Sequence, residues 1–374
     1  MTRLRLLAVS GLAVLLMSAV VAQDKKDPAA DPKKDEAKKT DAKAADVKKD
    51  ETKKDETKKD ETKKDDAKKD GTPAADNPLS MKFVKDTPFW EEMTTKTIQN
   101  IKVQGLDVGQ NQEQTFTFKF EPKKQEGDKW IVTQTIEAVK MKIDIAGSPV
   151  SYDSATETAA GGTNTALSEF FKALKGSQFT LTIGKDCTVE KVDGREEFIK
   201  KLISANKSLE TLLNKILGEE AMKQMADPCF GVVPSAPKKP GDKWNKVVKL
   251  SLGPLGSYEN TYNFTYTKQT VDNAEIDVTV DLKYSPPAAD QGGETLPFKI
   301  KGGKIEQVKD DKSNRGKILF NTKAGRVESV DVSVKMTGTL SLEIGGTTTE
   351  VSLTQDQNTV VKTFDKNPVP DKKP

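Results

Sequence analysis

The chain has 374 residues, a formal net charge of +3 and no histidine. Without histidine it can form neither a Ser-His-Asp nor a Cys-His catalytic arrangement, and it has no imidazole for zinc binding or for acid–base catalysis. Its two cysteines are too few for a cysteine-rich metal site. The nearly balanced charge argues against a nucleic-acid partner, which attracts an excess of Lys and Arg. We therefore expect no cofactor, no metal and no nucleic acid.

Residues 1–22 have the pattern of a secretory signal peptide. Arg3 and Arg5 precede an apolar run from Leu6 to Val21, and Ala22 provides a small residue for cleavage. The run is short for a membrane span, and no later stretch is long enough to cross a bilayer. The pattern predicts a protein exported to the periplasm or the extracellular space, with no transmembrane segment after signal cleavage.

Residues 23–78 are of low complexity and mix both charges. The sequence Lys-Lys-Asp-Glu-Thr occurs at 48–52, 53–57 and 58–62. Such a polyampholyte offers almost nothing to bury, so the entropy lost on ordering has no offset and a disordered spacer is expected. A tether to an anionic wall or membrane surface is the alternative interpretation.

The folded part is predicted to begin with a β unit over residues 79–192. Phe116, Phe118 and Phe120 alternate with polar residues, which is typical of a half-buried strand. A return strand follows, and then a short helix near 167–174 and a further hairpin.

Residues 193–240 are predicted to form a helical insert and a Pro-rich connector. Leu209, Leu212, Leu213, Ile216 and Leu217 recur on one helical face, so this helix has to pack on something. The pattern fits a cap over a sheet or a lid over an apolar cavity equally well.

The two cysteines, Cys187 and Cys229, bracket the helical insert. In an exported protein a pair of cysteines favours a disulfide, so we predict a bridge between them. Two unpaired thiols at loop positions are the alternative.

A second β unit is predicted over residues 241–366, followed by a frayed tail at 367–374. Tyr262, Phe264 and Tyr266 repeat the aromatic alternation of the first unit, and Gly345-Gly346 is typical of a two-residue hairpin turn. The fold class expected is mainly β (α+β), with antiparallel sheets or half-barrels in two related units and a small helical insert between them. Convergent hairpin patterning could also explain the likeness of the units.

Catalytic templates fit poorly. Two S-x-x-K matches, at 204–207 and 235–238, lack their partner motifs, and 310–316 has broken calcium-loop spacing. Asp153-Ser154 is the most site-like pair, but we favour an Asx-type turn at a strand end as its explanation. Glu113 also lies near a strand end. We expect the protein not to be an enzyme.

The order of these motifs resembles a known family. An aromatic hairpin is followed by Val150-Ser151-Tyr152-Asp153-Ser154, by Phe179-Thr180-Leu181-Thr182, by helices, and by Gly241-Asp242-Lys243-Trp244 with a β meander. This is similar to a family of uncharacterised secreted bacterial proteins that carry a β-rich domain of unknown function. The resemblance covers roughly residues 90 to 366 and implies an exported β-rich protein, with no activity or site.

Three functions remain open at this point. The first is a non-enzymatic envelope or secreted protein with a binding or structural role and an unknown partner. The second is a carrier of a lipid or other apolar ligand in a β half-barrel cavity capped by helices. The third is a carboxylate-based hydrolase, which needs two converging acids. For the carrier, the predicted cavity lining is Phe116, Phe118, Phe120, Leu212, Leu213, Ile216, Tyr262, Phe264 and Tyr266.

Overall fold

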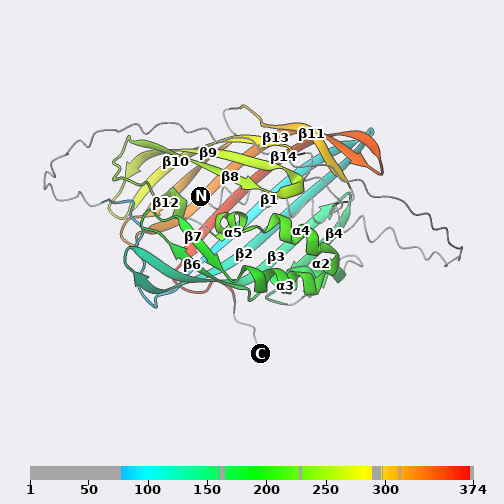
Figure 1. Cartoon of the computed structure of the whole chain (residues 1–374). Helices are drawn as coiled ribbons and strands as arrows, with labels where there is room; N and C mark the ends of the chain where they lie inside the picture. The colour runs from blue at the N-terminus through cyan, green and yellow to red at the C-terminus, as the bar shows by residue number, and fades with distance from the viewer. Residues whose placement is uncertain are drawn as a thin grey trace, which may run out of the picture.

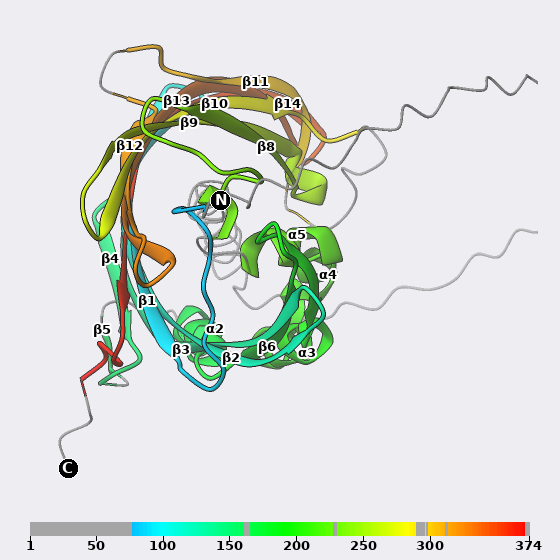
Figure 2. The same cartoon turned by 90° about the vertical axis from the view of Figure 1, so that its left-hand side faces the viewer.

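The computed structural model describes residues 77–156, 158–160, 165–226, 230–288, 296, 298–310 and 313–370. The strands of this part of the chain belong to one antiparallel sheet of 14 strands. The sheet curls into an open ring, and the helices lie along one side of it (Figures 1 and 2). The predicted signal peptide and all of the predicted spacer before residue 77 lie outside the described residues, as do Cys229 and the last four residues of the predicted tail.

The N-terminal half of the sheet is a meander of long strands. Its spatial order is β5-β4-β3-β2-β1, and a second branch leaves β3 through β6 to β7. The branch exists because β3 is longer than either partner: its first part pairs with β6 and its last part with β4. The strands are β1 (Phe89–Val103), β2 (Leu106–Glu126), β3 (Lys129–Ile145), β4 (Ser148–Asp153), β5 (Thr158–Ala160), β6 (Gln178–Ile183) and β7 (Val189–Asp193).

The C-terminal half continues the same sheet in the order β14-β13-β11-β10-β9-β8, with β12 paired to both β10 and β13. The hairpin between the last two strands turns at Gly345 and Gly346, whose φ angles are +57° and +83°. Positive φ at both turn residues is what a tight two-residue hairpin needs, so the turn prediction is confirmed. The strands are β8 (Lys243–Ser251), β9 (Ser257–Gln269), β10 (Asn273–Ser285), β11 (Lys299–Gln307), β12 (Arg315–Asn321), β13 (Arg326–Ile344) and β14 (Thr347–Phe364).

The two halves meet where β1 pairs with β14. The pairing runs without interruption from Trp90 opposite Phe364 to Val103 opposite Val351. The buried apolar side chains of both halves and of the helices form one cluster. The prediction of a mainly β, antiparallel protein is therefore confirmed. The division into two related units is not confirmed, because both regions form one sheet over one core.

Short helices complete the ring between the two edge strands. They are α2 (Thr165–Leu174), α3 (Arg195–Ala205), α4 (Glu210–Ile216) and α5 (Glu219–Ala226), with 3₁₀ turns η1 (Lys207–Leu209), η2 (Phe230–Val232) and η3 (Gly253–Leu255). The helix α5 contacts both β7 and β8, each of which pairs with only one strand. The indole Nε1 of Trp244 on β8 also donates to the carbonyl oxygen of Val232, 3.2 Å away. Helices therefore stand where the sheet does not close.

Candidate functional site

The concave face of the sheet combines inward-facing residues from both halves of the chain. Strand side chains alternate between faces, so each strand contributes every second residue to the interior of the ring. The helices lie on the β3 and β6 side of the ring (Figure 2). Along β13 the inward residues are apolar and almost fully buried: Val330, Val332, Val334 and Met336.

The three phenylalanines predicted on one face of a strand do share the concave face of β2. Their rings form a series, with centroids 5.8 Å apart between Phe116 and Phe118 and 6.5 Å apart between Phe118 and Phe120. Phe120 is completely buried, whereas Phe116 and Phe118 are only partly buried. Phe116 and Phe118 therefore present aromatic surface inside the ring.

The other predicted lining residues join the same buried cluster. Tyr262, Phe264 and Tyr266 alternate inward along β9, and each is at most 1% exposed. On α4, Leu212 and Leu213 are at most 2% exposed. Ile216, at 1% exposed, belongs to the cluster as well. The structure thus gathers all nine residues into one core, and their role as a ligand surface stays a prediction.

A set of polar side chains on the concave face was missed by the sequence analysis. It occupies three adjacent strands in register: Thr97 on β1 lies between Gln112 on β2 and Gln357 on β14. On each of the three strands, the residues two positions before and two positions after continue this arrangement. The set therefore has three rows of three side chains, and each side chain is at most 4% exposed. We call this set the polar grid. It consists of Thr95, Thr97, Gln99, Gln110, Gln112, Gln114, Gln355, Gln357 and Thr359.

Several side chains of the polar grid bond to one another. Thr95 Oγ1 and Thr359 Oγ1 are 3.3 Å apart, and Gln99 Nε2 donates to Gln355 Oε1 at 3.3 Å. Gln112 Nε2 donates to Gln114 Oε1 at 3.2 Å. These bonds cross the β1–β14 pairing and run along β2, so the grid is partly self-satisfied.

Four buried polar atoms of the grid have no hydrogen-bond partner. They are Thr97 Oγ1, Gln99 Oε1, Gln110 Nε2 and Gln112 Oε1. A buried polar atom without a partner costs about 1–3 kcal/mol, so native proteins rarely leave such atoms unmatched. Four such atoms on the two adjacent strands β1 and β2 mark this part of the concave face as unusual.

The convex face has the opposite character. Cross-strand ion pairs cover it, such as Lys249 with Glu259 at 2.9 Å and Lys301 with Glu343 at 2.8 Å. In each pair the lysine lowers the pKa of the glutamate, first through the hydrogen bond and then through its charge. Exposed pairs of this kind contribute little to stability. The convex face is thus an ordinary solvated surface, and the concave face is where specificity can arise.

Tyrosines supply the ionisable groups near one end of the concave face. The rings of Tyr258 and Tyr284 contact each other in a tilted arrangement, with centroids 5.1 Å apart, and Tyr284 Oη donates to the carbonyl oxygen of Leu255 at 3.0 Å. Burial raises the pKa of Tyr258 to about 12. The pKa of Tyr284 is also raised, chiefly by burial and then by Tyr258. Both phenols stay neutral at ordinary pH.

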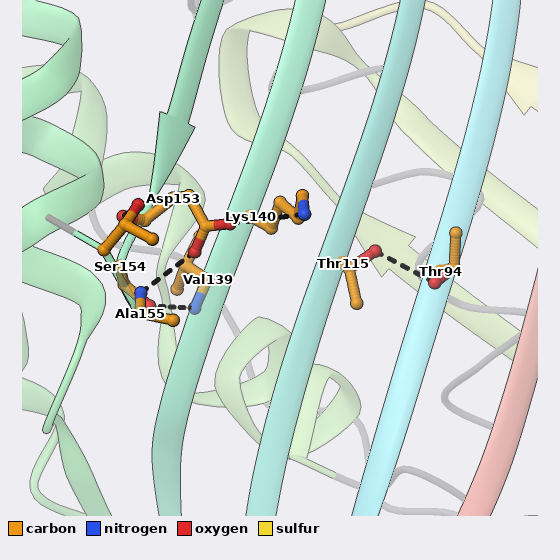
Figure 3. A network of polar contacts seen from close by, with 8 residues as sticks. Thr94, Thr115, Val139, Lys140, Asp153, Ser154 and Ala155 are labelled. Carbon is orange, nitrogen blue, oxygen red and sulfur yellow. Dashed lines mark hydrogen bonds and ion pairs between the residues drawn. The ribbon is translucent and has the colours of Figure 1, made fainter. Parts of the chain in front are cut away.

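The pair Asp153-Ser154 forms a turn at the end of β4. Asp153 Oδ1 accepts from the backbone N–H of Ala155 at 2.9 Å, which is the predicted Asx-type turn. Ser154 is completely buried, and its Oγ accepts from the backbone N–H of Val139 at 2.8 Å (Figure 3). Lys140 pairs with Asp153 across the strands at 3.2 Å. These bonds give the pair a structural role.

Glu113, the other acid considered as a site residue, lies on the exposed convex side of β2. Its carboxylate is 3.8 Å from the amine of Lys96. Among the described residues, no three Asp, Glu or Cys side chains lie close enough together to hold a metal ion. No helix in this part of the chain is both long and apolar enough to span a membrane.

The predicted disulfide is not seen among the described residues. Cys187 is buried in the turn before β7, with Sγ 4.0 Å from the carbonyl oxygen of Lys185. Cys229 lies outside the described residues. The bridge stays a prediction.

A sequence comparison places the chain in a family. The profile of a family of unknown function, DUF6263, matches residues 127–327, which is more than half of the chain. The chain belongs to this family. The matched region runs from the start of β3 to the start of β13, so it includes the helices and β8 to β12. The expected domain of unknown function is therefore confirmed, while export from a bacterium stays a prediction. A search of curated proteins finds no match.

Solved structures resemble this DUF6263 member only weakly. Lipovitellin, from a study of its lipid–protein interactions, aligns with a TM-score of 0.35 and 8% identity over 77% of this chain and 26% of its own. The chain thus spans about a quarter of lipovitellin. OccK5 of Pseudomonas aeruginosa aligns with a TM-score of 0.21 and 6% identity, over 75% of this chain and 98% of its own. The outer membrane protein OpdK of the same organism aligns with a TM-score of 0.17 and 7% identity, over 75% of this chain and 100% of its own. At these scores none of the three bears on function.

Proposed function

We propose that this protein is an exported, non-catalytic binding protein that carries an apolar or amphipathic molecule on the concave face of its sheet. The observation that carries the proposal is the composition of that face. It is aliphatic and aromatic along strands from both halves of the sheet, and helices complete the ring where β7 and β8 leave it open. Binding sites for small apolar molecules have this character, with a few placed polar groups among apolar ones.

The partly buried aromatic residues support this proposal. Large rings inside a solid core are usually well buried, because each contributes about 1.5–3 kcal/mol when removed from water. Phe116 and Phe118 instead keep part of their surface accessible on the concave side. They are the residues that an acyl chain or another apolar group would cover.

Native mass spectrometry of the purified protein, combined with solvent extraction, tests the proposal. We expect the full chain, expressed in its own host, to retain an apolar molecule. The double variant Phe116→Ala, Phe118→Ala should lose most of this molecule. Because the two rings are not fully buried, the variant should stay folded, as measured by circular dichroism.

Trp90→Ala is the matched control. Trp90 lies on the opposite face of β1, with the amine of Lys119 6.0 Å from its ring centroid. This variant removes a large ring without changing the concave face, so it should keep the ligand. A clean mass for the unmodified protein would contradict the carrier function and favour a purely structural role. Equal retention by both variants would contradict the assignment of the ligand to the surface of Phe116 and Phe118.

A further inference from the structure

The polar grid interrupts a face that is mainly apolar, whose other buried polar residues include Glu91, Gln134 and Asn260. Its rows are flanked on β13 by Val332, Val334 and Met336, and on β3 by Met141, Ile143 and Ile145. Apolar residues at the nine positions would bury the same area without any polar atom to satisfy. The polar grid thus lowers the stability of the sheet at its centre, and packing alone does not explain its presence.

The unpaired atoms of the grid form a mixed set of donors and acceptors. Gln99 Oε1 and Gln112 Oε1 accept, Gln110 Nε2 donates, and Thr97 Oγ1 can do either. The bonds that Gln99 Nε2 and Gln112 Nε2 donate within the grid fix the orientation of these two amides, so their Oε1 atoms are the ones left without a partner. A ligand that matches this set has to both donate and accept hydrogen bonds, as hydroxyl and amide groups do.

Charge narrows the class of ligand further. Every side chain of the grid is uncharged, and so are those of the two flanking columns. The nearest acid on the same face of β1 is Glu91, four residues before Thr95 and hence about 13 Å away along the strand. A phosphate, carboxylate or ammonium group placed on the grid would be buried without a counter-charge, which is costly.

We propose that the polar grid binds the uncharged, hydroxyl-rich headgroup of an amphipathic molecule, of which a sugar headgroup is the simplest case. This inference rests on the proposed carrier function and names the class of its ligand. The row beside the grid is apolar and contains Val361, Met93 and Phe116, with Phe118 beyond it. The apolar chain of the same molecule would lie along these residues while its headgroup satisfies the four unpaired atoms.

Calorimetric titration of the delipidated protein with single-chain amphiphiles tests the inference. The probes each contain a twelve-carbon chain and differ in headgroup: dodecyl maltoside, dodecylphosphocholine, laurate and dodecanol. Each is used below its micelle concentration or, for dodecanol, below its solubility limit. We expect dodecyl maltoside to bind at least about tenfold more tightly than laurate or dodecylphosphocholine, which corresponds to about 1.4 kcal/mol.

Variants at the grid separate headgroup recognition from chain binding. Gln110→Met with Gln112→Met keeps side-chain length and removes two of the unpaired atoms. It should weaken dodecyl maltoside about tenfold and leave dodecanol within about threefold. Asn100→Met with Asn111→Met changes the exposed opposite face of the same strands and should alter neither.

The outcomes distinguish the two proposals. Binding of all four probes with equal affinity, or a preference for a charged headgroup, overturns the headgroup inference and leaves the carrier function standing. Loss of dodecyl maltoside binding in the control variant but not in the grid variant also overturns it. If no probe binds and no ligand co-purifies, both proposals fail. The comparison of headgroups on the unmodified protein stands even where a variant does not fold.

Discussion

Replacing Thr97 by Val should stabilise the ligand-free protein. The two side chains have nearly the same shape, so the change removes a hydroxyl and creates no cavity. Thr97 is 2% exposed, and its Oγ1 has no hydrogen-bond partner. Such a hydroxyl costs about 1–3 kcal/mol, and we expect the variant to recover about 1 kcal/mol of it.

Thr95 provides a matched comparison on the same strand and the same face. It is completely buried, but its Oγ1 lies 3.3 Å from Thr359 Oγ1. Thr95→Val removes that bond and leaves the partner hydroxyl unsatisfied, which should cost about 1 kcal/mol. The two variants should therefore differ by about 2 kcal/mol in the free energy of unfolding.

Urea unfolding of the delipidated protein, followed by far-UV circular dichroism, measures the difference. With a slope of about 3 kcal/mol per molar urea, 2 kcal/mol separates the two midpoints by about 0.7 M. If Thr97→Val lowered the midpoint as much as Thr95→Val does, the Thr97 hydroxyl would have a partner in the free protein. The polar grid would then be a satisfied structural network, and the case for a ligand there would be lost.

Three further expectations concern other parts of the fold. Because the pKa of Tyr258 is raised from 10.0 to about 12, the unfolded chain loses this proton first. The free energy of unfolding should therefore fall by at most about 3 kcal/mol between about pH 10 and 12. In alkaline denaturation curves recorded in parallel, the Tyr258→Phe variant should show a smaller fall. Ser154→Ala should lower the free energy of unfolding by about 1–3 kcal/mol, because it removes the acceptor for the N–H of Val139. A loss of ligand binding without any loss of stability would refute the structural role of Ser154. Alkylation of the denatured, unreduced protein should leave Cys187 unlabelled because of the predicted bridge, and labelling before reduction would exclude that bridge.

The sequence predicted the elements better than their assembly. The alternation of aromatic and polar residues along 114–120 and 260–266 identified β2 and β9. The apolar stripe at 209–217 identified α4. These patterns are local, so they can be read from a short window. The pairing of β1 with β14 joins residues that lie far apart in the chain, for example Thr95 and Thr359, which are 264 positions apart. No local pattern reports such a pairing, which is why two units were expected where one sheet exists.

The candidate site was partly predictable for the same reason. The aromatic lining residues stand out because they are large and alternate with polar neighbours. The grid residues also alternate, as in Gln110, Gln112 and Gln114, but polar residues at every second position favour a solvated face when only one strand is considered. Their inward position follows from apolar neighbours on the same strands, such as Met93 and Phe116, and from the register with β13 and β3.

The location of the grid also links the site to the closure of the sheet. One of its columns lies on β14, one on β1 and one on β2, so the site is complete only when the two ends of the folded chain have paired. Among the described strands that pairing is the most non-local, and a non-local pairing loses the entropy of loop closure before its contacts compensate for the loss. Apolar residues at this seam would strengthen the closure, and the chain instead places nine polar side chains there, four of whose atoms lack partners. The loss of stability at this pairing indicates that the polar side chains of the grid serve another function. Recognition of a headgroup matches their chemistry.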